Sequence, residues 1–251
     1  MKADAGTLTQ DAFLGGRVRV LQPRCGYRAA TDPVFLAAAV PARSGQQVLE
    51  LGCGAGVASL CLAARVPGLM LTGVELQPDY AELARRNAAL NGVAFDVLTS
   101  DLSALPAALR ARAFDHVIAN PPYHFPHYPA STEPGRATAL HEATPLPMWI
   151  DVALRRTRTG GHFTMIHLTE RVPDLLRALI PRASVTVLPL AARAQRPARR
   201  VIVQARKGGR SPFRLLPPLV VHDGDTHPGD RDHFTATARG ILRDAAALAL
   251  D

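Results

Sequence analysis

The chain has 251 residues, of which 47% are hydrophobic, enough for one α/β domain with a substantial core. No apolar run is long enough to span a membrane, and the first residues do not resemble a signal peptide, so we expect a cytoplasmic protein with no membrane partner. Three cysteines without a Cys-x-x-Cys pair argue against a disulfide framework or structural zinc. The net charge of +8 favours a polyanionic partner such as RNA, although the arginine bias is also typical of a GC-rich genome.

The first 47 residues are predicted to form a hairpin and a helix. Alternating basic and apolar residues at 15–21 are typical of a hairpin strand, and 22–28 of a loop. Thr31-Asp32-Pro33 predicts a helix start, because Thr31 or Asp32 can cap it and proline favours the first turn.

From residue 48 onwards, strands and helices alternate, which predicts right-handed crossovers and a parallel sheet. We expect a Rossmann-like α/β fold whose mostly parallel, seven-stranded sheet has helices on both faces and an antiparallel edge. The Gly160-Gly161 pair is expected to end a helix, and 124–144 to be irregular. The expected strands are 48–51, 70–75, 95–99, 114–119, 162–167, 185–190 and 201–206.

A glycine-rich turn follows the first of these strands. Gly52-Cys53-Gly54-Ala55-Gly56 allows the backbone to approach a ligand closely, and the next helix begins with free N–H groups. A dinucleotide fingerprint would have its third glycine at position 57, where this chain has valine. Glu75 ends the second strand, where a carboxylate can accept both ribose hydroxyls, and Asp101 follows the third. Together they predict a nucleoside site at the carboxyl ends of the strands.

Asn120-Pro121-Pro122-Tyr123 follows the fourth strand. Two prolines exclude a helix and withhold two backbone donors. The Asn120 side-chain oxygen and the Pro121 carbonyl are two acceptors, which suit an amino group with two hydrogens, and Tyr123 provides an aromatic face for a planar base. The stretch therefore predicts a site for an exocyclic amino group, with adenine as the leading candidate, although a plain turn can have the same sequence.

The Gly-x-Gly-x-Gly turn resembles the first motif of the class I S-adenosylmethionine-dependent methyltransferases. With Asn120 to Tyr123 added, the core at 48–206 resembles the members that methylate a planar amino nitrogen, among them adenine-N6 enzymes and release-factor glutamine methyltransferases. The resemblance implies S-adenosyl-L-methionine as the cofactor, and Asn120, Pro121 and Tyr123 as catalytic residues. The cofactor contacts implied are Glu50, Gly52, Gly54, Gly56, Glu75, Leu76, Asp101, Leu102 and Asn120.

The flanks carry a narrower resemblance. Residues 22–28 and 31–37 look like the stretch before the glycine motif in bacterial tRNA (adenine-N6)-methyltransferases, which modify the adenosine next to the anticodon of a valine tRNA; the tail at 218–224 is also similar. This resemblance implies that Tyr27, Arg28 and Asp32 lie near the cofactor. It also implies that 1–47 cap the site on a methyltransferase domain of 48–251, with an extension at 211–251, as effectively one domain.

The expected function is therefore methyl transfer to the N6 of an adenine in RNA, with the tRNA anticodon loop as the leading substrate. Three alternatives remain open: a release-factor glutamine methyltransferase, although only 47 residues precede the core; a non-catalytic RNA-binding protein; and a small-molecule or DNA methyltransferase. The histidines near 124–127 and 222–227 match no ligand spacing, so no metal is expected. The arginines at 193–200 are either an RNA-facing patch or a solvated loop.

Overall fold

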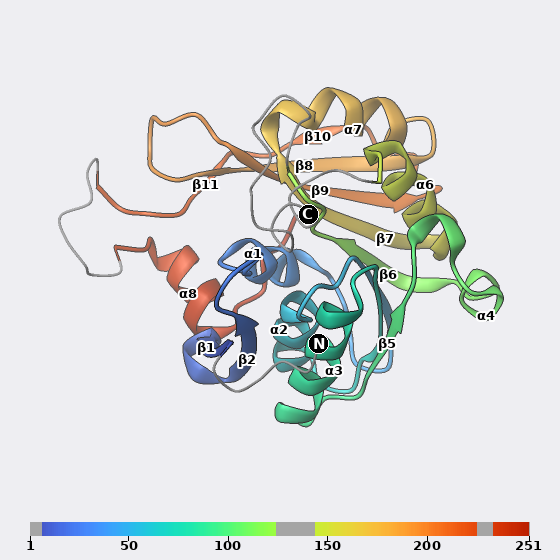
Figure 1. Ribbon diagram of the computed structural model, residues 1–251. Helices are drawn as coiled ribbons and strands as arrows, with labels where there is room; N and C mark the ends of the chain where they lie inside the picture. Colours follow the sequence, from blue (N-terminus) through green and yellow to red (C-terminus); the bar gives the residue numbers. More distant parts are fainter. Residues whose placement is uncertain (1–6, 124–143, 225–232, 251) are drawn as a thin grey trace.

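The computed structural model describes residues 7–123, 144–224 and 233–250 (Figure 1). The segment expected to be irregular, 124–144, therefore lies outside the described residues except for Thr144.

The elements alternate along the chain much as the sequence predicts. A hairpin of β1 (Leu8–Phe13) and β2 (Val18–Pro23) precedes the central sheet. The sheet strands are β3 (Gln47–Leu51), β4 (Met70–Glu75), β5 (Phe95–Thr99), β6 (Phe114–Ala119), β7 (Thr157–Leu168), β8 (Ala183–Ala191), β9 (Arg200–Lys207), β10 (Arg214–Leu215) and β11 (Leu219–Val220). The α-helices are α1 (Asp32–Ala39), α2 (Val57–Arg65), α3 (Pro78–Leu90), α4 (Ala107–Arg110), α6 (Leu146–Arg156), α7 (Val172–Leu179) and α8 (Ala236–Asp244).

The central sheet has the order β10-β8-β9-β7-β6-β3-β4-β5, with β11 also pairing with β8. Strands β5, β4, β3, β6 and β7 run parallel, and β9 is antiparallel to both β7 and β8, which confirms a mostly parallel sheet with an antiparallel edge. The prediction of seven strands is wrong: the described residues form nine. The two additional strands, β10 and β11, are only two residues long. Each pairs with β8, and no local sequence pattern predicts this pairing.

Strand β7 begins earlier than expected and contains the glycine pair. The prediction that Gly160-Gly161 ends a helix is wrong, because α6 ends at Arg156 and β7 starts at the next residue. The register of β7 on β6 shifts between Phe114 and His116, so the glycines lie in an irregularity of the strand. A Cβ on Gly161 would lie 2.7 Å from the Asp115 carbonyl oxygen, which explains why this position has no side chain.

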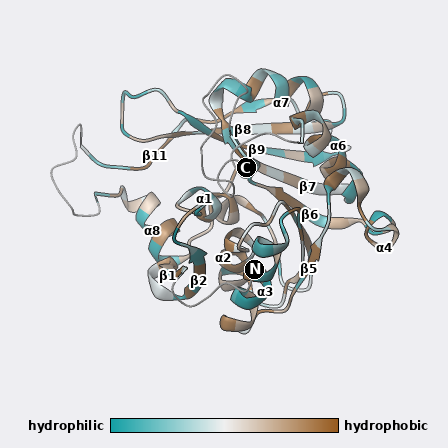
Figure 2. Cartoon of the chain, in the orientation of Figure 1, coloured by the Kyte–Doolittle hydropathy of each residue, from teal (hydrophilic) through white to brown (hydrophobic). Residues whose placement is uncertain are grey.

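Each face of the sheet carries its own layer of helices and hydrophobic core. Successive side chains of a strand point to opposite faces: Val48 and Ile118 belong to the core under α1, α2 and α8, whereas Leu49 and Val117 belong to the core under α6 and α7. Figure 2 shows hydrophobic residues along the central strands and hydrophilic residues on the outside of helices such as α3 and α7. No helix in the described ranges is long and apolar enough to cross a membrane.

Candidate active site

The glycine turn leads from the end of β3 into α2. Gly52 has a φ of +63°, and a Cβ there would lie 2.5 Å from Cη2 of Trp149. The indole of Trp149, on α6, therefore packs directly against the backbone of the turn, and its Nε1 donates a hydrogen bond to the Thr144 carbonyl at 3.1 Å. Trp149 was not among the predicted residues, because nothing near it in the sequence indicates this contact.

Glu75, at the end of β4, joins the glycine turn to the start of α3. One carboxylate oxygen accepts from the Gly54 N–H at 2.8 Å and the other from the Gln77 N–H at 2.9 Å. The side chain is only 7% exposed, and burial raises its pKa while the backbone hydrogen bonds oppose that rise. The carboxylate predicted to bind ribose is thus already fixed beside the turn.

Glu50 lies deeper than the other predicted contacts. It is 3% exposed, and one oxygen accepts from the Ser59 N–H at 3.1 Å and from the Ser59 hydroxyl at 2.5 Å. Burial raises its pKa to about 8, so the carboxyl group is largely protonated at neutral pH. The contacts of this group are with α2, within the protein.

The residues after β4 and β5 differ in exposure. Leu76 is 44% exposed, unusual for a large apolar side chain beside a buried carboxylate. Asp101 is exposed and accepts from the Ser103 N–H at 2.8 Å, which caps a 3-10 turn over Leu102–Ala104. Leu102 is buried in the core under α6. Glu75 is the last residue of β4 and Asp101 comes after the neighbouring strand β5, as expected.

Four predicted residues come together after β6. The Tyr123 hydroxyl lies 2.5 Å from Oδ1 of Asn120 and 3.1 Å from Oδ2 of Asp32, and Nδ2 of Asn120 donates to the Tyr27 hydroxyl at 3.4 Å. The predicted cap is not formed by a side chain, because the Asp32 carboxylate faces Tyr123 instead. Tyr27 and Asp32 are about 90 positions from Asn120 and Tyr123 in the chain, so the fold alone creates this cluster.

Arg200, at the start of β9, completes the cluster. Its Nε donates to Oδ2 of Asp32 at 3.1 Å, and its guanidinium carbon lies 4.6 Å from the centre of the Tyr123 ring. The ring of His167 packs on Tyr123 at 5.3 Å, tilted by 60°. Burial, with help from the nearby arginines, lowers the pKa of His167 to about 3, so this ring is neutral. From the sequence, Arg200 was expected in a run of arginines that is either an RNA-facing patch or a solvated loop.

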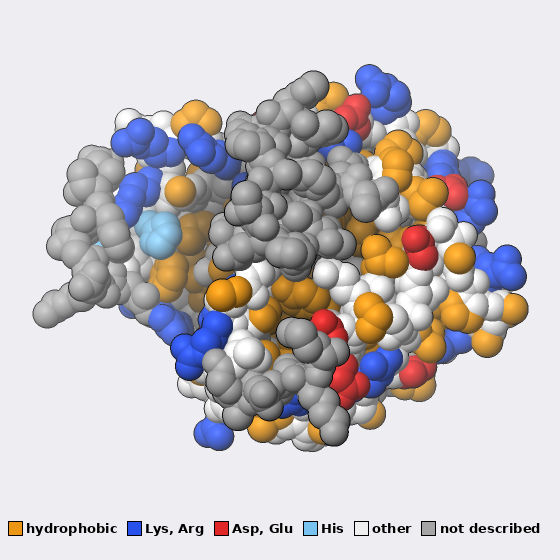
Figure 3. All heavy atoms as spheres, in the orientation of Figure 1, with side chains coloured by type: hydrophobic (Ala, Val, Ile, Leu, Met, Phe, Trp, Pro, Cys, Tyr) orange, Lys and Arg blue, Asp and Glu red, His pale blue; other side chains and the backbone are white. Residues whose placement is uncertain are grey.

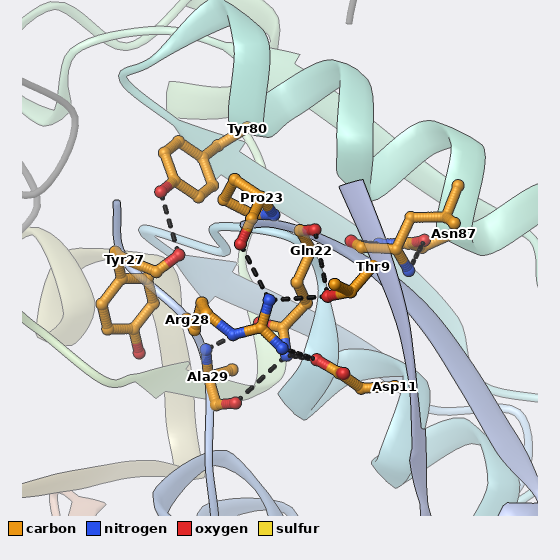
Figure 4. A network of polar contacts seen from close by, with 10 residues as sticks. Thr9, Asp11, Gln22, Pro23, Tyr27, Arg28, Ala29, Tyr80 and Asn87 are labelled. Atoms are coloured by element: carbon orange, nitrogen blue, oxygen red, sulfur yellow. Dashed lines mark hydrogen bonds and ion pairs between the residues drawn. The ribbon is translucent and has the colours of Figure 1, made fainter. Parts of the chain in front are cut away.

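The side chain of Arg28, a predicted cofactor residue, contacts the hairpin. Figure 4 shows its guanidinium turned towards the hairpin, where it forms an ion pair with Asp11 at 2.6 Å and donates to Thr9 and to the Pro23 carbonyl. These contacts fasten the loop before α1 to β1 and β2, so the visible role of Arg28 is to hold the loop that carries Tyr27.

Two asparagines, Asn87 on α3 and Asn91 directly after the helix, attach the hairpin to the rest of the site. Asn87 is fully buried; its Oδ1 accepts from the Leu21 N–H at 2.7 Å, and its Nδ2 donates to the carbonyls of Leu21 and Ala55. Asn91, one turn later, makes the same pair of contacts with Arg19. The Tyr80 hydroxyl, also on α3, donates to the Tyr27 carbonyl at 3.0 Å (Figure 4).

Among the described residues, no group of three or more His, Cys, Asp or Glu is placed to hold a metal ion. His124, His127 and His227 lie outside those residues.

The arrangement defines a class of enzyme. A glycine turn after β3, a fixed carboxylate after β4 and Asn-Pro-Pro-Tyr after β6, at one end of a sheet of this order, are the site of a class I methyltransferase, the class that uses S-adenosyl-L-methionine. Residues 30–135 match the family model of the methyltransferase small domain.

Curated relatives narrow the class. The tRNA1(Val) (adenine(37)-N6)-methyltransferase of Dickeya chrysanthemi is 30% identical over 240 residues, which cover 90% of each protein. The enzyme of the same name from Porphyromonas gingivalis is 34% identical over 177 residues, 66% of this chain and 68% of that protein. The chain belongs to the tRNA1(Val) (adenine(37)-N6)-methyltransferase family.

Solved structures agree on the fold. A protein from Agrobacterium tumefaciens, Atu636, described as a predicted O-methyltransferase, superposes with a TM-score of 0.70 at 27% identity, over 87% of this chain and 98% of that one. The 16S rRNA N2 G1207 methyltransferase of T. thermophilus, solved with AdoMet and guanosine, gives a TM-score of 0.54 at 20% identity, over 80% of this chain and 50% of that one.

Proposed function

We propose that the protein transfers a methyl group from S-adenosyl-L-methionine to the N6 of an adenine in RNA, with a tRNA anticodon loop as the substrate and the cytoplasm as its location. The observation that carries the proposal is the placement of Asn120, fixed by Tyr123 and Tyr27 at the end of β6, beside the glycine turn. A relative that matches along 90% of the chain carries the name of this activity.

The residues around the glycine turn fit an adenosyl cofactor. Gly54 and Glu75 present a bare backbone and a fixed acceptor for ribose, and the exposed Leu76 offers apolar surface to an adenine ring. Asp101 supports a contact with the adenine amino group, because the cap hydrogen bond uses one of its two oxygens, Oδ1. The hairpin and helix of the first 47 residues would then cap the site through Tyr27 and Asp32.

Methyl transfer to this nitrogen depends mainly on the orientation of the reacting groups. The cofactor supplies an electrophilic methyl group on a sulfonium. The adenine amino nitrogen is a poor nucleophile, because its lone pair is delocalised into the ring. Acceptance of its two hydrogens by the Asn120 oxygen and the Pro121 carbonyl would turn the lone pair towards the methyl group, and positioning at near-attack distance supplies most of the rate gain. A base that stacks on Tyr123 must use the part of the ring that Arg200 and His167 leave free.

The alternatives are not favoured. A release-factor methyltransferase and a non-catalytic RNA-binding protein share parts of the sequence pattern. The relative that covers 90% of this chain, and the one that covers 66%, are both named as tRNA adenine-N6 enzymes.

The test is transfer of labelled methyl to unmodified tRNA, followed by nucleoside analysis. We expect N6-methyladenosine as the product, and we expect Asn120→Ala to abolish turnover while calorimetry shows unchanged cofactor affinity. Glu82→Gln, an exposed change on α3, is the control. Label in a protein glutamine rather than in tRNA would reject the RNA substrate, and loss of cofactor affinity in Asn120→Ala would reject the role assigned to Asn120.

A further inference from the structure

We propose that Arg200 is a positioning residue for methyl transfer: acting through Asp32 and Tyr123, it sets the orientation of the Asn120 carboxamide. The inference rests on the proposed function and adds a residue from the far end of the chain to that site.

The Tyr123 hydroxyl has one proton and two acceptors within reach. Oδ1 of Asn120 is 2.5 Å away and Oδ2 of Asp32 is 3.1 Å away. A carboxylate is normally the stronger acceptor, so an unopposed Asp32 would draw the proton away from Asn120.

Arg200 opposes that pull. Its Nε donates to the same Asp32 oxygen, at 3.1 Å, in an ion pair whose side chains are 34% and 26% exposed. The positive charge of the Arg200 guanidinium weakens that Asp32 oxygen as an acceptor for Tyr123, and the proton is left for Asn120. The Asn120 oxygen keeps a second lone pair for the substrate amino group.

Arg200 also fixes the ring that carries the hydroxyl. Its planar guanidinium lies over the Tyr123 ring at 4.6 Å, and His167 packs on the same ring. Tyr123 is therefore restrained by a face contact and by its hydroxyl at once. Other arginines of the same loop do not share this role, since Arg193 donates to the carbonyls of Asp223 and Gly224 and Arg199 is exposed.

The kinetic test compares Arg200→Gln, Tyr123→Phe and the double variant on the tRNA that wild type methylates. We expect kcat to fall about 10- to 100-fold in each, since small misplacement of the reacting groups costs this much, with the KM for cofactor and tRNA unchanged. The kcat of the double variant should be no lower than that of the slower single variant. Both substitutions disrupt the same set of contacts around Tyr123, so their effects do not add. Arg200→Lys should not restore kcat, because an ammonium group lacks the planar fork.

A second measurement does not depend on turnover. The Asn120 side-chain amide resonances, assigned by their loss in Asn120→Ala, should shift or broaden in Arg200→Gln and not in Arg177→Gln, a control on the outside of α7. If wild type methylates no tRNA, the proposed function fails while this readout still tests Arg200.

Two results would overturn the inference. If the fold-losses in kcat of the two single variants multiplied in the double variant and the KM for tRNA rose, Arg200 would be a direct RNA contact. Unchanged Asn120 resonances in Arg200→Gln would show that it does not position the carboxamide.

Discussion

At the scale of single residues, burial decides which acids carry charge at neutral pH. Glu50 and Glu75 are both buried under the glycine turn, and the pKa of each is raised by burial. They differ in their partners: Glu75 accepts hydrogen bonds from two backbone N–H groups that point at it from loops, whereas Glu50 relies on Ser59 alone. Glu50 is therefore the acid whose ionisation should affect folding.

We predict that Glu50→Gln removes a pH dependence of stability. The pKa of Glu50 is about 8 in the folded protein and about 4.3 in an unfolded chain. Because the folded pKa is the higher, the stability from the neutral form is complete below about pH 4.3 and is lost as the pH rises through about 8.

Glutamine keeps the acceptor for Ser59 without a charge. The variant should match wild type near pH 4.5 and exceed its free energy of unfolding by about 2–5 kcal/mol near pH 8. Urea denaturation at both pH values measures the difference. If the free energy of unfolding depended on pH in the same way in both proteins, Glu50 would ionise as readily in the folded protein as in the unfolded chain.

The sequence indicated only part of the site at this scale. Glu75 and Asn120 were predictable, because strand ends in a parallel sheet meet at one edge. Trp149 and Arg200 were not, since Arg200 and Asp32 are 168 positions apart and only the folded chain brings them together. Arg28 was placed near the cofactor by resemblance, and its ion pair with Asp11 was not predicted.

At the scale of elements, two asparagine side chains at the end of α3 bond to the backbone of β2, much as a neighbouring strand would. Asn87 on α3 and Asn91, the residue that caps its C-terminus, are four residues apart. They bond to the backbone N–H and carbonyl of Leu21 and of Arg19, which are two residues apart on β2. Helix spacing of four and strand spacing of two thus match on facing surfaces. The position of the loop that carries Tyr27 depends on this match.

We predict that Asn87→Ala loosens the hairpin. It removes three hydrogen bonds to buried or half-buried backbone groups, which should cost about 2–4 kcal/mol of stability. Affinity for S-adenosylhomocysteine should also fall, because Tyr27 loses its support. Urea unfolding, calorimetry and hydrogen exchange at the Leu21 amide measure the three effects.

Asn91→Ala is the matched control, because its hairpin contacts are exposed. It should cost about 1 kcal/mol or less. An equal cost for the two variants would mean that burial of Asn87 contributes nothing.

Elements with strong hydrophobic periodicity were predictable to within a few residues. Strands that form only because they pair with a neighbouring strand were not. The helix at α3 and the strand at β6 follow from local patterns. Strands β10 and β11 exist because β8 offers unpaired backbone groups, and the irregular start of β7 depends on a close approach to Asp115; neither has a local signal.

At the scale of the whole molecule, charge is the property that bears on RNA. Figure 3 shows Lys and Arg side chains spread around the margin of one face, with Asp and Glu side chains scattered between them. The loop between β8 and β9 carries Arg196 and Arg199, both exposed and without a carboxylate partner among the residues that the structure describes. This loop leads directly into Arg200 at the site, so it is well placed to hold an RNA backbone.

We predict that Arg196→Gln and Arg199→Gln each weaken tRNA binding and flatten its salt dependence. Loss of one phosphate contact should lower the slope of log affinity against log salt by about 0.7. Filter binding over a range of salt concentrations measures the slope. Arg177→Gln, whose guanidinium already pairs with Asp174 at 3.0 Å, should leave it unchanged; the same slope in all three variants would make the loop a solvated one.

The double pairing of β8 has a consequence for how the protein behaves in a crowded solution. β8 is nine residues long and mostly buried, and it pairs with β9 on one side and with β10 and β11 on the other. Without those short strands, its outer backbone groups would form an open template for another chain. A variant that lacks residues 214–220 should therefore self-associate before it loses the chemistry of the glycine turn. This part of the tail thus contributes to the colloidal stability of the protein.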